Sequence, residues 1–166
     1  MRIKGLYLLG VVPSILIVDW LTKRWALATL WDGRQIETLG GLVPLTLAFN
    51  RGAAFGMGIG DDSRWLFVPI TILALVLLAV LFRQTSTSDH VRLSATAAIV
   101  AGALGNLWDR VRWDRGVVDF IGPIDLGLWD FPIFNVADIA ITCGAILLAL
   151  SFWQEERQLA AAASVS

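Results

Sequence analysis

A long apolar run ends in the polar stretch Gly105-Asn106-Leu107-Trp108-Asp109-Arg110. Two further acidic stretches follow, Val117-Val118-Asp119-Phe120 and Phe134-Asn135-Val136-Ala137-Asp138, and the second of them opens another apolar run. Asn and Asp side chains therefore gather at or beside the ends of two hydrophobic spans. Ionisable groups at membrane depth are energetically costly, so their presence there marks a candidate functional site.

The composition predicts an integral membrane protein. Of the 166 residues, 57% are hydrophobic and 16% are charged, and the mean hydropathy is +0.70. A soluble domain carries about 45–50% apolar and about 25% charged residues. The length suits one domain, and a net charge of −1 provides no basic surface for nucleic acid.

Four apolar runs are long enough to cross a hydrocarbon core of about 30 Å. We expect a single integral membrane domain over residues 1–166, in which an even number of spans puts both termini on one side. Ala and Gly in the third run favour close helix packing. The expected spans cover about 6–30, 65–82, 91–108 and 134–153, the extramembrane segments 31–64 and 109–133, and a tail 155–166.

The first extramembrane segment contains a strand pattern. Val43, Leu45, Leu47 and Phe49 alternate with less apolar residues, which is the period of a half-buried strand. Asn50-Arg51-Gly52 follows as a turn, and a glycine-rich loop, expected to be mobile, comes next at 53–58. The expected fold class is an all-α membrane protein with four transmembrane helices and a small extramembrane β-sheet.

Several polar residues allow two interpretations. Asp19 and Lys23 are four residues apart and can pair on one helix face, or Lys23 and Arg24 can snorkel to the interface with Asp19 as a neutralising partner. Asp109 opposes the helix dipole at a C-terminus, so it either pairs with Arg110 or takes a direct part in function.

The acids of the second extramembrane segment and the fourth span differ in setting. Asn135 can cap the fourth span, which puts Asp138 at the third helical position, where capping alone would explain an acid. Asp119 has β-branched and aromatic neighbours, which suits a strand edge or a re-entrant bend. We expect Asp114, Asp125 and Asp130 to lie on the solvated surface.

Zinc and disulfide chemistry find little support in the sequence. The single cysteine, Cys143, lies in an apolar run, where we expect it to be a packing residue. The single histidine, His90, lies in a polar linker, so there is no His/Cys ligand set for zinc. We expect neither a metal nor a cofactor, and rank a metal site built from carboxylates alone low.

Five motifs together resemble lipoprotein signal peptidase (signal peptidase II), a family of bacterial inner-membrane aspartyl proteases. They occur in family order across nearly the whole chain, with four spans between them. Any one motif is weak, whereas five in order are highly specific. The motifs are Asp19-x-x-Thr22-Lys23, Asn50-x-Gly52-Ala53-Ala54-Phe55, Gly105-Asn106-x-x-Asp109-Arg110, Val117-Val118-Asp119-Phe120 and Phe134-Asn135-x-Ala137-Asp138.

The resemblance implies a multi-pass enzyme of the bacterial cytoplasmic (inner) membrane. Both termini would be cytoplasmic, and the active site and the sheet of segment 31–64, which cradles the substrate, would lie at the outer face. The enzyme would act as a monomer among membrane lipids and cut a diacylglyceryl-modified prolipoprotein just before its lipidated cysteine. By motif position the catalytic pair is Asp119 and Asp138, and the supporting or substrate-binding residues are Asp19, Lys23, Asn50, Gly52, Asn106, Asp109, Arg110 and Asn135.

The chemistry of two adjacent carboxylates fits such a role. Carboxylates about 3 Å apart cannot both ionise easily and share one proton. The ionised member takes a proton from water while the other donates to the scissile carbonyl. We expect Asp138 to be the ionised member, because a helix N-terminus favours its charge.

Two non-protease functions compete with this hypothesis. In a small transporter or channel, Asp19, Lys23, Asp109 and Asp138 would line an ion path, which requires polar residues through the full membrane thickness. In an assembly factor, the polar motifs would only hold helices together.

Overall fold

Four helices long and apolar enough to cross a membrane dominate the computed structural model, which describes residues 2–52 and 64–163. The candidate spans are Ile3–Thr29, Leu66–Gln84, His90–Arg112 and Val136–Ala163. The expected glycine-rich loop at 53–58 lies outside the described residues. The helical elements are α1 (Arg2–Leu6), the π-helical turn η1 (Tyr7–Val11), α2 (Val12–Thr29), α3 (Arg64–Gln84), α4 (His90–Arg112) and α5 (Val136–Ala163).

Two helices extend beyond their expected ends. Helix α4 continues to Arg112, so Asp109 and Arg110 belong to its last turns and not to the following loop. Helix α5 continues to Ala163 and takes in most of the expected tail. The residues after Trp153 include Glu, Gln, Arg, Leu and Ala, which are strong helix formers and sustain the helix after the apolar run has ended.

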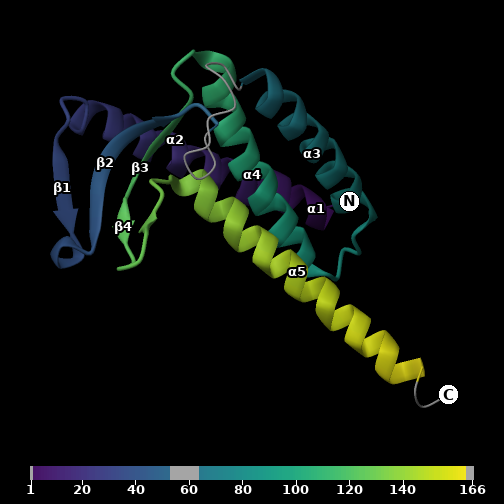
Figure 1. The fold of residues 1–166 in the computed structure, drawn as a ribbon. Coiled ribbons are helices and arrows are strands. Elements are labelled where there is room, and N and C mark those ends of the chain that lie inside the picture. Colours follow the sequence, from purple (N-terminus) through teal and green to yellow (C-terminus); the bar gives the residue numbers. More distant parts are fainter. Residues whose placement is uncertain (1, 53–63, 164–166) are drawn as a thin grey trace.

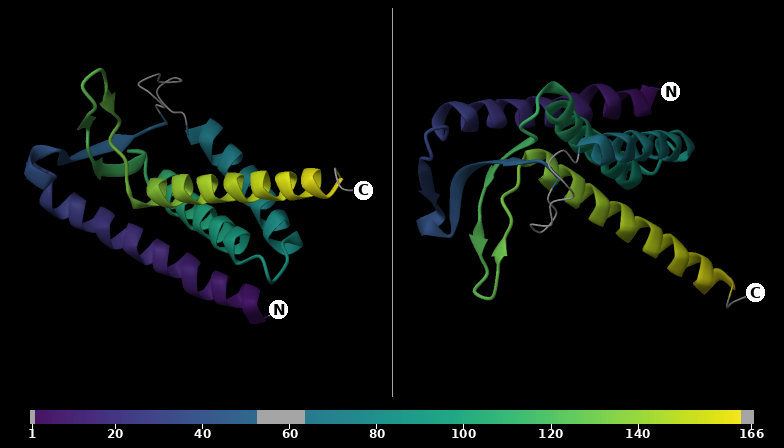
Figure 2. Two further views of the ribbon diagram at one scale, coloured as in Figure 1. Left: turned by 90° about the horizontal axis from the view of Figure 1, so that it is seen from below. Right: turned by 45° about the horizontal axis from the view of Figure 1, so that its top comes forward.

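Helix α4 is the centre of the bundle and packs against α2, α3 and α5 (Figures 1 and 2). Small residues permit the close packing of α4 on α5. A Cβ added to Gly144 would lie 2.7 Å from the Ala95 carbonyl oxygen, and one added to Gly102 would overlap the Ala137 carbonyl. The predicted role of the small residues of the third run is confirmed at Gly102 and Ala95, and Gly144 of α5 contributes to the same contact.

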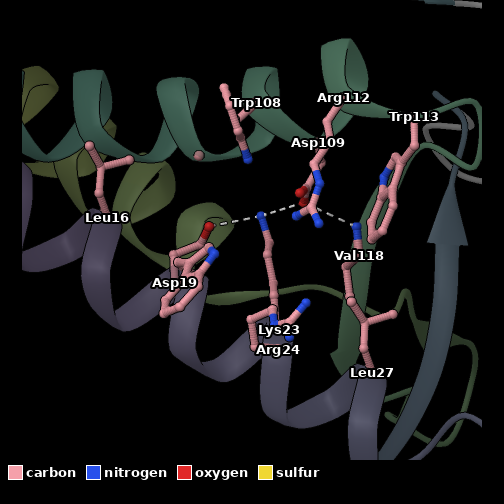
Figure 3. Close-up of a pocket in the computed structure, with 12 residues that line it drawn as sticks. Leu16, Asp19, Lys23, Arg24, Leu27, Trp108, Asp109, Arg112, Trp113 and Val118 are labelled. Atoms are coloured by element: carbon pink, nitrogen blue, oxygen red, sulfur yellow. Dashed lines mark hydrogen bonds and ion pairs between the residues drawn. The ribbon is translucent and has the colours of Figure 1, made fainter.

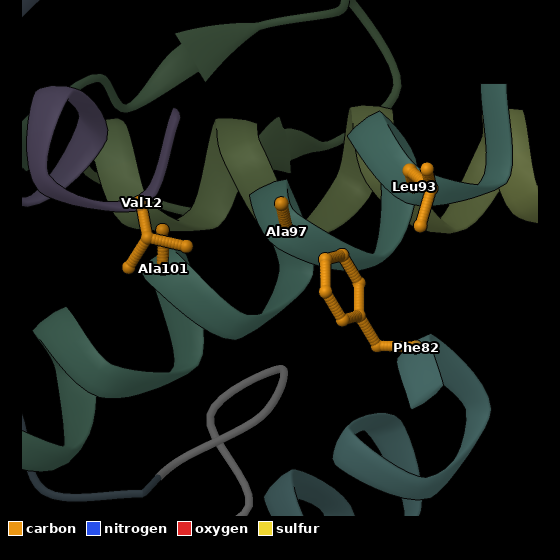
Figure 4. Close-up of a cluster of buried hydrophobic side chains, with 5 residues drawn as sticks. All are labelled: Val12, Phe82, Leu93, Ala97 and Ala101. Carbon is orange, nitrogen blue, oxygen red and sulfur yellow. The ribbon is translucent and has the colours of Figure 1, made fainter. Parts of the chain in front are cut away.

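Hydrophobic and polar contacts join the helices at the end away from the sheet. Buried side chains of α2, α3 and α4 meet in one cluster, Val12, Phe82, Leu93, Ala97 and Ala101 (Figure 4). Arg92 of α4 pairs with Glu155 of α5 at 2.6 Å and donates to Ser151 Oγ at 2.9 Å. Cys143 is exposed, so its assignment as a packing residue is wrong: it lies on the α5 surface, where it lines a groove together with Ile15 of α2 and Ala98 of α4.

A three-stranded antiparallel sheet lies beyond the helix ends, in the order β1 (Gln35–Thr38), β2 (Val43–Asn50), β3 (Val117–Ile121). The strand predicted from the alternation at 43–49 is confirmed, although every one of its residues is only partly buried. Strand β3 is an edge strand, as one interpretation of Asp119 required, and its register sets Asp119 opposite Ala48 and Val117 opposite Asn50. A short hairpin follows, β4 (Ile124–Asp125) with β5 (Asp130–Phe131).

The sheet and the chain ends lie at opposite ends of the bundle (Figures 1 and 2). Ala26 and Leu30 at the end of α2 pack with Phe120 of β3, which fixes the sheet against the helices. Val118 of β3 also bonds Asp109 near the C-terminal end of α4 and Asn135 just before α5. The elements that carry the acidic motifs converge at this junction.

Candidate functional site

A buried ion cluster lies between α2 and α4. Lys23 Nζ is 2.8 Å from Asp19 Oδ2 and 2.9 Å from Asp109 Oδ2. Lys23 is only 4% exposed, so it does not snorkel to the interface, and the alternative in which it would is wrong. The partner of Asp109 among the described residues is Lys23 and not Arg110. Buried charges are tolerated when they are paired and hydrogen-bonded, as these are.

Asn106 links this ion cluster to α5. Its Oδ1 accepts a hydrogen bond from Lys23 Nζ at 3.0 Å, and its Nδ2 donates to Asp138 Oδ1 at 2.7 Å. Asn106 lies one helical turn before Asp109, so both face the same neighbours. One amide therefore connects the cation of α2 to the acid of α5.

The first turn of α5 is capped by side chains from two directions. Asn135 Oδ1 accepts from Asp138 N at 2.9 Å, and Asp138 Oδ2 accepts from Asn135 N at 3.1 Å. This is a reciprocal capping box, and the predicted positions of Asn135 and Asp138 are confirmed. Ala137 N donates to Asp19 Oδ1 at 3.0 Å, so α2 satisfies the intervening N–H group.

Asp119 reaches the same junction from β3. Its Oδ1 accepts a hydrogen bond from Asn135 Nδ2 at 2.7 Å, so Asn135 contacts both acids, through its side chain and through its backbone. Asp119 is 2% exposed. Burial, followed by the negative charge of Asp138, raises the pKa of Asp119 to about 7 against the opposing effects of Asn135, Asn50 and Lys23.

The remaining predicted residues lie around this junction. Asn50 ends β2, beside β3, and its side-chain Oδ1 accepts from Gly52 N at 2.8 Å, as expected of a turn residue. Asn50 also lowers the pKa of Asp119, so it has both roles. Gly52 is buried and has a φ of +110°, which favours glycine. Arg110 lies over the Phe67 ring at 5.4 Å and within electrostatic range of Asp138 and Asp119.

Three contributors to the site were not predicted as site residues. Val118 donates its N–H to Asp109 Oδ2 at 3.3 Å, and its carbonyl accepts from Asn135 Nδ2 at 3.2 Å. Ala137 contributes its backbone N–H, as described above. A Cβ on Gly105 would lie 2.7 Å from Asp19 Oδ2, so glycine gives that carboxylate its room. All three residues lie inside the quoted motifs, but Val118 and Ala137 contribute only main-chain groups, which leave no side-chain signal.

A pocket of about 190 Å³ opens between α2 and α4 on the side of the ion cluster (Figure 3). Figure 3 shows Lys23 between Asp19 and Asp109, with Asp109 bonded in turn to the Val118 backbone. Trp20, Trp108 and Trp113 also line it, but neither Asp119 nor Asp138 does. Within 2–52 and 64–163, no three His, Cys, Asp or Glu side chains are grouped as metal ligands.

Comparison with known proteins gives one consistent match. The family model described as signal peptidase (SPase) II matches residues 11–154. The lipoprotein signal peptidase of Ectopseudomonas mendocina is 40% identical over 152 residues, which cover 90% of this chain and 89% of the relative. That of Geobacter sulfurreducens is 40% identical over 153 residues, covering 91% of this chain and 94% of the relative.

Solved structures show the same fold. A bacterial membrane enzyme determined by the in meso method at 2.3 Å resolution superposes with a TM-score of 0.78 and 32% identity, covering 92% of this chain and 90% of the other. A second, at 1.9 Å resolution, has the same TM-score and 34% identity, covering 89% of this chain and 92% of the other.

Proposed function

This chain belongs to the signal peptidase II family of bacterial membrane proteases, which remove signal peptides from lipoproteins, and on that premise we propose how it cuts. Asp119 and Asp138 are the catalytic pair and activate one water molecule between them. The observation that carries the proposal is Asn135, which hydrogen-bonds both acids although they come from different elements. Asp19, Lys23, Asn50, Gly52, Asn106, Asp109, Arg110 and Asn135 support the pair or the bound substrate.

The hydrogen-bond donors around the pair support a division of labour. Both oxygens of Asp138 accept from N–H groups, Oδ1 from Asn106 and Oδ2 from Asn135, which favours the ionised form. Asp119 accepts from Asn135 Nδ2 at Oδ1, and burial beside Asp138 outweighs this bond and the one from Asn50, so the shared proton is assigned to Asp119. A pKa of about 7 keeps Asp119 largely protonated below neutral pH.

The reaction then follows from these protonation states. Asp138 takes a proton from water as the water oxygen attacks the scissile carbonyl carbon, and Asp119 gives its proton to the carbonyl oxygen. When the tetrahedral intermediate breaks down, the C–N bond is cleaved and the proton held by Asp138 passes to the leaving amine. The hydroxyl proton of the intermediate returns to Asp119, so both acids end in their starting states.

The substrate is a prolipoprotein whose cysteine carries a diacylglyceryl group, and the bond cut is the one before that cysteine. The acyl chains would lie against the exposed apolar helix surfaces, at roughly 0.8 kcal/mol for each buried CH₂. Such a contribution explains a requirement for a lipidated substrate. Because both acids belong to one chain, a monomer suffices.

We place both termini in the cytoplasm and the catalytic pair near the outer leaflet of the bacterial inner membrane. The chain ends and the sheet lie at opposite ends of the bundle, which supports placing the termini and the catalytic pair on opposite sides of the membrane (Figure 1). The test is to replace Cys143 by Ala, introduce single cysteines at residues 35 and 157, and label them with an impermeant reagent on intact spheroplasts. Labelling at residue 157 but not at 35 would reverse the orientation.

Cleavage of a purified precursor tests the chemistry. We expect Asp119→Asn and Asp138→Asn each to lower kcat by at least 100-fold in detergent, because an amide keeps the shape but cannot share the proton. Asp130→Asn in the exposed hairpin strand β5 is the matched control. Near wild-type turnover of either variant would exclude the pair, and equal cleavage of an unmodified precursor would exclude the lipid requirement.

A further inference from the structure

We propose that Lys23 is a positioning residue that fixes the Asn106 amide and thereby determines which acid of the pair holds the proton. The inference rests on the proposed function of Asp119 and Asp138. Among the described residues Lys23 has no hydrogen bond or ion pair with either acid: its charge acts on Asp119 without contact, and its hydrogen-bonded connection to the pair runs through Asn106.

The chemistry of the ammonium group sets the orientation of the amide. Lysine carries three donors and no acceptor. Lys23 directs two of them to Asp19 and Asp109, and the third meets Asn106 at 3.0 Å. The end of the Asn106 side chain that faces Lys23 must therefore be the oxygen, and the NH₂ group must point the other way, toward Asp138.

The orientation of the Asn106 amide determines which oxygens of Asp138 and Asp119 accept hydrogen bonds. Asn106 Nδ2 reaches Asp138 Oδ1 at 2.7 Å as a donor, so that oxygen accepts and carries no proton. Asn106 Oδ1 also accepts from Asn135 Nδ2 at 3.0 Å, which helps to aim the Asn135 amide at Asp119 Oδ1. With the opposite orientation, Asn106 would present an oxygen to Asp138 and require a proton there.

Lys23 is also held firmly enough to impose this direction. Its side chain lies buried between α2 and α4, and the two carboxylates that grip it are themselves fixed by backbone N–H groups, Asp19 by Ala137 and Asp109 by Val118. Rotation of the Asn106 amide would set its NH₂ against an ammonium group that is only a donor. Within residues 2–52 and 64–163, the other charges that act on Asp119 are those of Asp138 of α5 and Arg110 of α4, and neither of them changes which end of the amide faces Lys23.

A matched pair of variants separates orientation from charge. Lys23→Gln and Lys23→Met remove the same charge, but only glutamine keeps an N–H donor for Asn106 Oδ1. We expect Lys23→Met to lower kcat by roughly 10- to 100-fold with KM unchanged. This is the size of effect known for residues that orient a functional side chain by hydrogen bonding, as in metal sites. Lys23→Gln should recover most of that loss. Arg24→Met, at the exposed neighbouring position, is the control.

The pH profile gives a second readout. In Lys23→Met the Asn106 oxygen keeps only the hydrogen bond from Asn135 Nδ2, so the amide turns more easily, and the pair loses a cation. Both effects favour protonation of the pair, so the pH optimum should move to higher pH. In Lys23→Gln the orientation is kept and the optimum should move less. A structural role alone would change Tm in both variants without separating their pH profiles.

The design remains informative if either single variant does not fold. Both substitutions are then made together with Asp109→Asn, which keeps the net charge of the three-residue ion cluster at −1. Equal kcat and equal pH profiles for the glutamine and methionine variants would overturn the inference. If Asp119→Asn and Asp138→Asn are inactive in the same assay, that result leaves the proposed function standing; if they remain active, it is the proposed function that fails.

Discussion

Asp19 and Ala137 are 118 residues apart in the chain, yet Asp19 Oδ1 accepts a hydrogen bond from Ala137 N at 3.0 Å. The carboxylate of one membrane span thus caps the first turn of another, while its second oxygen pairs with Lys23 at 2.8 Å. A single side chain therefore joins the N-terminal span to the helix that carries Asp138. Its removal affects both an N–H group and a buried cation.

We predict that Asp19→Ala lowers the free energy of unfolding more than Asp19→Asn does. Removing one partner of a buried ion pair typically costs about 3–5 kcal/mol, and Lys23 keeps Asp109, so the lower end is expected. Asparagine retains an oxygen for Ala137 N. Thermal unfolding in detergent measures the order, with Asp32→Asn in the exposed turn after α2 as the control; equal Tm values for the two Asp19 variants would contradict it.

The activity of the enzyme should fall as the pH rises through about 7. In the proposed mechanism Asp119 must hold a proton to donate it, and burial raises the pKa of this carboxyl to about 7. The measurement is kcat for a lipidated precursor between pH 5 and 9. A profile that stays flat to pH 9 would show that the proton comes from another group.

Asp119 should also make stability fall with pH over a defined window. The unfolded carboxyl has a pKa near 3.8, whereas the folded one keeps its proton up to about 7. Between these values the folded state binds more protons, so stability decreases as the pH rises from about 4 to 7 and then levels off. The Tm advantage of Asp119→Asn over the wild type should therefore grow across this window, and a constant Tm difference would refute the assignment.

Gly144→Ala should destabilise the α4–α5 contact. The added Cβ would lie 2.7 Å from the Ala95 carbonyl oxygen and 2.7 Å from Ile99 Cγ1, and overpacking of this kind costs about 1–3 kcal/mol. Gly10→Ala is the control, because a Cβ added at Gly10 would have no heavy atom within 4 Å outside its own helix and chain neighbours. An unchanged Tm in Gly144→Ala would contradict this prediction, because it would mean that α4 and α5 move apart enough to accept the methyl group with no loss of stability.

The spans and the caps could be predicted because their signals are local. A run of apolar residues reports its own length, and Asn135 with Asp138 three residues later carries the chemistry of a helix start within four positions. The alternation at 43–49 likewise revealed a strand. Helix α4 runs on to Arg112, a few residues beyond the expected span, and the buried pairing of Asp109 with Lys23 holds its last turns in place.

The network of hydrogen bonds and ion pairs in the site could not be predicted in the same way. Whether Lys23 would snorkel or be buried depended on which helix lies opposite it, and that is a property of tertiary packing. The link between Lys23 and Asn106 spans 83 residues, and Val118 and Ala137 contribute only main-chain atoms. The resemblance to a family identified the polar positions, but the direction of each hydrogen bond required coordinates.

The attachments between α4 and α5 recur along much of their shared length. Asn106 holds Asp138 at the sheet end, glycines bring the backbones together in the middle, and Arg92 grips Glu155 and Ser151 at the far end. Helices α4 and α5 therefore form a rigid pair, because separating them would break contacts at both ends and in the middle. We therefore expect the proposed lipid-bearing substrate to enter the site by displacing a less firmly held element. Helix α3, whose main neighbour is α4, is the element that we expect to move.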